Sequence, residues 1–88
     1  MSRSLKINKY TTKFKALCPN DNSIINEYKC TIYTDRIVMV EDIGFCLNQF
    51  AKKAIYQEDL TEKIADIFKA KVKIVGLHLG VKIKSISK

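Results

Sequence analysis

The feature that most constrains the fold of this chain is the order of its hydrophobic patterns. Stretches in which apolar and polar residues alternate occupy both ends of the 88-residue sequence, and two stretches with helical spacing lie between them. Alternation is typical of strands with one buried face, whereas apolar residues three and four positions apart are typical of amphipathic helices. The sequence therefore predicts the order strand, strand, helix, helix, strand, strand.

The first two predicted strands are separated by a polar segment. Residues 10–17 alternate, and the Cys-Pro pair at 18–19 should end this strand. Residues 20–23 have the composition of a loop. A second strand is expected over about residues 28–40, with an interruption at 35–36 left open.

Two helices are expected next, over residues 43–54 and 60–68, where apolar side chains recur every three or four positions. Asp59, with Glu62 three residues later, matches an N-cap and its capping box. Lys69 suits the negative C-terminal end of the second helix.

Residues 71–86 predict two short strands that turn between Gly76 and Gly80. The whole pattern predicts an α+β fold, a four-stranded antiparallel sheet with two helices on one face, in a single domain over residues 1–88. Such a sheet leaves edge strands unpaired, and proteins seldom leave such edges free. We therefore expect a homo-oligomer with ligand sites at its subunit junctions.

Composition limits the environment and the partners of the chain. The formal net charge is +7, which favours polyanionic partners, although a solvated lysine-rich surface would give the same count. Three cysteines without Cys-x-x-Cys spacing favour free thiols in a reducing compartment, so we expect a cytoplasmic protein. No membrane partner is expected, because the longest apolar run, Ile37 to Val40, is too short to cross a bilayer.

A more specific signal lies in residues 50–68, FAKKAIYQEDLTEKIADIF. This stretch resembles the helix-loop-helix of GTP cyclohydrolase I and, more distantly, that of the queuosine-pathway nitrile reductases. Both belong to the tunnelling-fold (T-fold) superfamily of purine- and pterin-binding enzymes. The resemblance implies a T-fold with β-β-α-α-β-β order that assembles into a ring. It also implies that Glu58 anchors a purine-like ring, with Gln57 beside it, where the reductases have histidine.

The chemistry of a carboxylate at Glu58 fits this role. A guanine-like ring presents a ring N–H and an exocyclic amine side by side, which one carboxylate can accept together. A ligand without those donors would leave the charge unpaired, so the site would discriminate. The alternative is that Glu58 only complements the positive N-terminal end of the second helix.

A second candidate is Cys18. Leu17-Cys18-Pro19 resembles the nitrile-reductase motif whose thiolate attacks the nitrile of cyano-deazaguanine to form a thioimide. The resemblance implies that Cys18 is a nucleophile, a role that suits a thiolate because it also leaves readily. The alternative is a buried small hydrophobe. Ile25 stands where the family's proton-handling Asp should be, and Asp21 and Glu27 remain open as substitutes.

The cyclohydrolase and reductase activities fit the sequence less well. Cyclohydrolases use a zinc site, but the matching positions here include Asp21 and Gly80, so we expect no metal. His78 matches the cyclohydrolase catalytic histidine and is either a ligand contact or a half-buried strand residue. The reductase segment that holds the nicotinamide cofactor reads Glu41 to Cys46 here, without a lysine. We therefore expect no cofactor, and only Glu41 remains as a candidate contact.

A chain that has the thiol and the purine anchor but lacks the lysine segment for the nicotinamide cofactor resembles the reductase-like archaeosine synthases. These enzymes add ammonia to cyano-deazaguanine that is already in tRNA. The implied function is a tRNA-modifying amidine synthase of the amidinotransferase type. Four lysines of the last hairpin would contact tRNA phosphates, and the target base would be flipped into the site: Lys71, Lys73, Lys82 and Lys84. The alternatives are a non-catalytic purine- or pterin-binding T-fold protein, a nitrile reductase and a cyclohydrolase-type enzyme.

Overall fold

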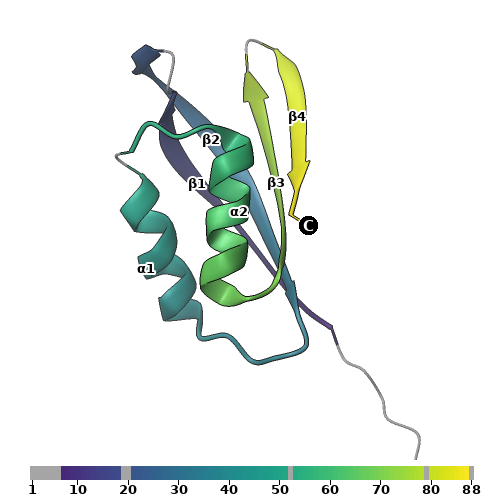
Figure 1. The fold of residues 1–88 in the computed structure, drawn as a ribbon. Coiled ribbons are helices and arrows are strands. Elements are labelled where there is room, and N and C mark those ends of the chain that lie inside the picture. The colour runs from purple at the N-terminus through teal and green to yellow at the C-terminus, as the bar shows by residue number, and fades with distance from the viewer. Residues whose placement is uncertain (1–6, 19–20, 52, 79, 88) are drawn as a thin grey trace, which may run out of the picture.

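The computed structural model describes residues 7–18, 21–51, 53–78 and 80–87, with the backbone alone for residues 18 and 21–25. Figure 1 shows six elements in the predicted order. They are β1 (Asn8–Cys18), β2 (Asp21–Thr34), α1 (Val40–Phe50), α2 (Gln57–Phe68), β3 (Lys71–His78) and β4 (Val81–Ile86). The predicted α+β class and the β-β-α-α-β-β order are therefore confirmed.

The four strands form one antiparallel sheet in the order β1-β2-β3-β4. Both helices lie on the same side of this sheet (Figure 1), where α1 packs against β1 and α2 packs against β3 and β4. β1 and β4 are the two edge strands. Within the described ranges, neither helix has the length and apolar character needed to span a membrane.

The strand register divides the sheet into two faces with different composition. The helix face is formed by the even-numbered residues of β1, β2 and β3, and one of its cross-strand rows is Phe14, Tyr28, Gly76 and Ile83. The open face is formed by the odd-numbered residues of 8–17 in β1, of 25–34 in β2 and of β3, and by the even-numbered residues of β4; the β1–β2 register shifts beyond Leu17. Apolar side chains fill the helix face because only that face is covered by helices.

The core lies between the helix face and the two helices. Its largest fully buried side chains come from both layers: Tyr28, Cys30, Ile32, Leu60, Thr61, Ile64, Val72 and Ile74. α1 contributes Leu47 and Phe50 at the spacing of one helical face. Burial, and to a lesser degree the nearby Cys46 thiol, raises the pKa of the Cys30 thiol from 9.0 to about 12. Both of these cysteines are free thiols in the structure.

The bounds of β2 differ from the prediction at both ends. β2 begins at Asp21, so residues 21–23 belong to a strand and not to a loop. It ends at Thr34, immediately before residues 35–36, where the sequence left an interruption open, and only the continuation to Val40 is wrong. The reason is tertiary: Arg36 turns away from the sheet and its Nη2 donates hydrogen bonds to the carbonyls of Phe68 and Lys69, at 2.7 and 2.6 Å.

α2 begins earlier than the capping pattern indicated. Its N-cap is Tyr56 and its first residue is Gln57, so Asp59 lies in the first turn and the predicted capping box with Glu62 is wrong. The first turn is closed by the Leu60 amide, which donates to the carbonyl of Tyr56 at 2.9 Å, and the Gln57 side chain is bonded to backbone carbonyls of β3 and β4. α2 ends at Phe68, and the following Lys69 adopts a left-handed conformation with φ 50°.

Candidate functional site

The end of β1 lies against the segment that connects the two helices. Leu17 pairs with Ala54 in an isolated parallel bridge. Cys18 is the next residue along β1, and Glu58 follows Ala54 by four residues on the way into α2. The fold therefore brings together the two segments that carry the predicted nucleophile and the predicted purine anchor. The side chain of Cys18 lies outside the described part of the structure.

Gln57 is buried at the start of α2, with 3% of its surface exposed. Its side-chain Nε2 donates to the carbonyl of Ile74 at 3.0 Å and to that of Ile83 at 2.9 Å. Two carbonyl acceptors fix the orientation of the amide, because only the NH₂ group can donate to both. The Gln57 side chain thereby joins α2 to β3 and β4, and its Oε1 is left to accept a hydrogen bond.

That hydrogen bond comes from His78. Its Nε2 lies 3.3 Å from Gln57 Oε1, which can only accept, so the neutral ring carries its proton on Nε2. The other ring nitrogen, Nδ1, then accepts from the Asn26 side-chain amide at 3.4 Å. Asn26 also donates to the Tyr28 hydroxyl at 3.3 Å. We call Asn26, Tyr28, Gln57 and His78 the polar network.

Sequence reasoning found two members of this network and missed Asn26 and Tyr28. The available signal was the strand alternation, which extends back from Cys30 to these two positions on the helix face. Both side chains are buried, at 6% and 1% exposure, and a buried amide and a buried hydroxyl require hydrogen-bond partners.

Gly76 makes room for the polar network. A Cβ at this position would lie 2.6 and 2.7 Å from two carbons of the Tyr28 ring and 3.1 Å from Gln57 Oε1. A glycine within a strand often marks such a close approach. The Tyr28 ring also packs against the Phe14 and His78 rings, with centroids 5.4 and 5.9 Å away.

Glu58 has a different environment from its neighbour Gln57. It is exposed in the first turn of α2, together with Asp59. Among the residues that the structure describes, its carboxylate has no hydrogen-bond or ion-pair partner within the chain. It is therefore free to accept hydrogen bonds from a ligand, at a helix end that is fixed by the buried Gln57.

The remaining predicted residues lie elsewhere. Glu41 is in the first turn of α1, at the opposite end of that helix from the connection to α2 (Figure 1). Glu27 is exposed on the open face opposite Lys15, so the sheet separates it from the polar network. The four hairpin lysines also share the open face. In the described ranges, no three His, Cys, Asp or Glu side chains gather into a group that could hold a metal ion.

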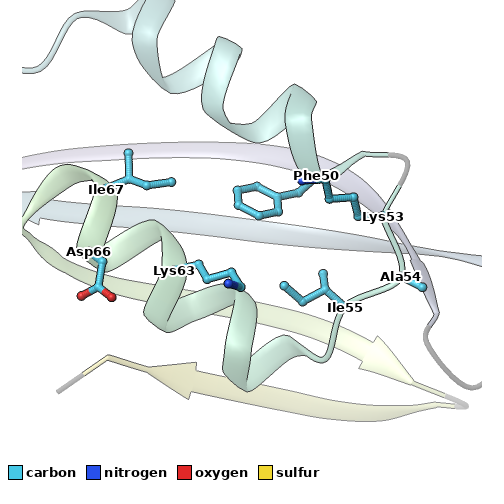
Figure 2. A pocket seen from close by; sticks show the side chains of 7 residues that line it. All are labelled: Phe50, Lys53, Ala54, Ile55, Lys63, Asp66 and Ile67. Carbon is cyan, nitrogen blue, oxygen red and sulfur yellow. The ribbon is translucent and has the colours of Figure 1, made fainter.

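A shallow groove of about 480 Å³ lies between the helices, on the side away from the sheet. Figure 2 shows Phe50 from α1 and Ile67 from α2 extending toward the space between the helices, with Ile55 on the connecting segment. The Lys53 ammonium lies 5.7 Å from the centre of the Phe50 ring. None of the predicted site residues lines this groove.

Comparison with known proteins finds a solved structure with the same fold. No family model matches the sequence, and no curated protein matches it. Among solved structures, the chain is similar to the crystal structure of the archaeosine synthase QueF-Like in the apo form, with a TM-score of 0.86 over 97% of this chain and 94% of that chain. Sequence identity is 14%, so the likeness concerns the fold. The chain thus has the fold of the archaeosine synthase QueF-Like, and the T-fold prediction is confirmed for the single chain.

Proposed function

We propose that this chain is a single T-fold domain that acts as a tRNA-modifying amidine synthase on cyano-deazaguanine. The observation that carries the proposal is the bridge between Leu17 and Ala54, which sets the strand end bearing Cys18 beside the segment that leads to Glu58. A nucleophile and a base anchor must lie close together to act on one ligand. The fold likeness to an archaeosine synthase supports the same reaction class.

The reaction divides into two balanced steps. The Cys18 thiolate attacks the nitrile carbon, a C–S bond forms, and the nitrile nitrogen takes up a proton to give a thioimide. Ammonia, or a donor that delivers it, then adds to the same carbon and the C–S bond breaks. The products are an amidine and the free thiol, so the cysteine is regenerated.

The proton in the first step has two candidate sources. Glu27 is on the open face, across the sheet from the polar network. Asp21 is the direct cross-strand neighbour of Cys18 in the sheet ladder. We therefore assign the proton-handling role to Asp21.

Recognition of the base is assigned to Glu58, which accepts from the ring N–H and exocyclic amine. Gln57 and His78 support it indirectly, because the amide of Gln57 is already bonded to β3, β4 and His78. Their role is to fix the first turn of α2 so that the Glu58 carboxylate is held in position before the ligand arrives. Preorganisation of this kind lowers the cost of binding.

Assembly into a homo-oligomer would complete the site. β1 and β4 present unpaired edges that a second copy can extend. Within one chain Glu41 lies at the far end of α1 from Glu58, so it can contact the ligand only from a second subunit. The site is accordingly proposed at a subunit junction, with the hairpin lysines Lys71, Lys73, Lys82 and Lys84 available to tRNA phosphates.

A second candidate function is a purine- or pterin-binding protein without catalysis. Ile25, which stands where the reductases have their proton-handling Asp, favours this alternative. Covalent chemistry separates the two functions, because a binding protein would hold cyano-deazaguanine without forming a bond to it.

Intact-mass measurement after incubation with cyano-deazaguanine is the decisive experiment. The wild type should gain the mass of one ligand, and Cys18→Ala should gain none. If the wild type binds the base but its mass does not change, the catalytic proposal fails and the binding protein is favoured.

The purine anchor is tested by a matched pair of variants in the first turn of α2. Glu58→Gln should lose affinity for the base, whereas Asp59→Asn, which removes the same charge from the same turn, should retain it. If the two variants changed the affinity for the base equally, Glu58 would only complement the positive N-terminal end of the helix.

A further inference from the structure

The open face of the sheet concentrates the positive charge of the chain. Eight lysines, supplied by all four strands, project from this face in the strand register: Lys9, Lys13, Lys15, Lys29, Lys71, Lys73, Lys82 and Lys84. Only Lys73 is partly buried, and the other seven are exposed. Glu27 is the one acidic residue on this face among the residues whose side chains the structure describes. The face therefore carries most of the excess positive charge.

Among the described residues, only one of these lysines, Lys15, has an acidic cross-strand partner, Glu27. Across the part of the chain that the structure describes, none of them forms an ion pair. Lys13 and Lys29 are direct cross-strand partners, an arrangement that is normally destabilising. A second copy packed face to face would add lysine against lysine. The charge pattern therefore fits an external polyanion and disfavours both internal pairing and self-association through this face.

One end of the open face also offers an aromatic ring. Tyr33 has Lys9 on one side and Lys71 on the other as cross-strand partners. It lines a hollow of about 570 Å³ with Lys71, Lys73, Ile7 and Ile86. Proteins that bind single-stranded nucleic acid combine positive charge for the backbone with aromatic rings on which bases stack. Tyr33 between two lysines has this combination.

We propose that the open face binds single-stranded RNA in a sequence-independent manner, with the lysines on its phosphates and Tyr33 stacked on a base. The choice of RNA as the polyanion rests on the proposed function, whereas the face, the strands and the stacking residue are new. A small phosphate fits less well, because the lysines spread over four strands, about 14 Å at the usual strand spacing. An extended chain of phosphates can reach several of them together.

Binding is tested by fluorescence anisotropy with a labelled single-stranded oligoribonucleotide that contains no deazaguanine, over a range of salt concentrations. The double variant Lys13→Gln/Lys29→Gln is compared with Lys53→Gln/Lys63→Gln, which removes two charges from the helix side. Each lost phosphate contact should reduce the slope of log affinity against log salt by about 0.7. The first variant should therefore lose about 1.4 from the slope, and the second should keep the wild-type slope.

The stacking role is tested at Tyr33. Tyr33→Ser should weaken binding at least about fivefold, the lower limit for loss of one stacked base, and Tyr33→Phe should bind like the wild type. Thermal melts of each variant verify that it is folded.

Three results would overturn the inference. The first is that the wild type does not bind the oligoribonucleotide. The second is that the two double variants lose the same amount of the salt slope. The third is that Tyr33→Ser binds with the same affinity as the wild type. The mass assay with the free base, run on the same wild-type preparation, separates this inference from the proposed reaction. Adduct formation without RNA binding refutes the inference alone, and RNA binding without an adduct refutes the reaction alone.

Discussion

Gly76→Ala tests whether close packing of Tyr28 and Gln57 over β3 holds the candidate site together. The added methyl group would lie 2.6 Å from the Tyr28 ring, a distance that real Cβ contacts do not tolerate. Tyr28 is 1% exposed and its ring contacts the Phe14 and His78 rings, so a shift of the ring would disturb both contacts. Either β3 shifts or the polar network opens.

The magnitude follows from two opposing effects. Overpacking of a filled core costs about 1–3 kcal/mol. Replacing a glycine inside a strand raises the free energy of unfolding by about 0.5–1 kcal/mol, because the unfolded chain loses conformational freedom. We expect a net destabilisation of roughly 1–2 kcal/mol, which for a domain of this size lowers Tm by about 5–15 °C.

Gly44→Ala is the matched control. Gly44 lies inside α1, is exposed, and has no atom within 4 Å of the position of an added Cβ. The same substitution there should stabilise the protein by about 0.5–1 kcal/mol through helix propensity. The two substitutions are therefore expected to change the free energy of unfolding in opposite directions.

Urea denaturation of the two variants and the wild type, followed by far-ultraviolet circular dichroism, measures both changes. If Gly76→Ala were as stable as Gly44→Ala, the Tyr28 ring would not be packed against β3 as described. The account of the polar network would then be refuted, because Gln57 Oε1 lies only 3.1 Å from the position of the same Cβ.

Four further predictions concern other parts of the chain. Arg36→Ala should lower the free energy of unfolding by about 1 kcal/mol, because two carbonyls at the end of α2 lose their donor, and Arg36→Lys should recover part of this in the same urea titration. Stability should fall as the pH rises from about 9 toward 12, because the raised pKa of Cys30 keeps its thiol protonated in the folded chain while the unfolded chain releases the proton; Cys30→Ala should show a shallower pH dependence. His78 is the single histidine, so ¹⁵N spectra of the neutral ring should show protonation on Nε2, and protonation on Nδ1 would contradict the network. Sedimentation should show an oligomer larger than a dimer, and a monomer at micromolar concentration would remove the proposed junction site.

Local patterning made the order of elements predictable. Residues 10–17 and 71–78 alternate because one face of each strand meets the helices, and α1 and α2 carry apolar side chains at helical spacing for the same reason. Such patterns depend on neighbours in sequence, so they can be read without a structure. The bounds were less predictable, because Arg36 and Gln57 find their partners in distant elements.

For the candidate site, too, some features could be predicted from the sequence and others required the tertiary structure. The sequence by itself supplied the candidates for chemistry: the thiol at the end of the first strand, the carboxylate of Glu58 and the excess of lysine. Only the tertiary structure decided which of them meet. The bridge from Leu17 to Ala54 joins the end of β1 to the entrance of α2, and strand register collects lysines from four strands on one face. Sheet pairing and helix packing link residues far apart in the chain, and no local pattern contains that information.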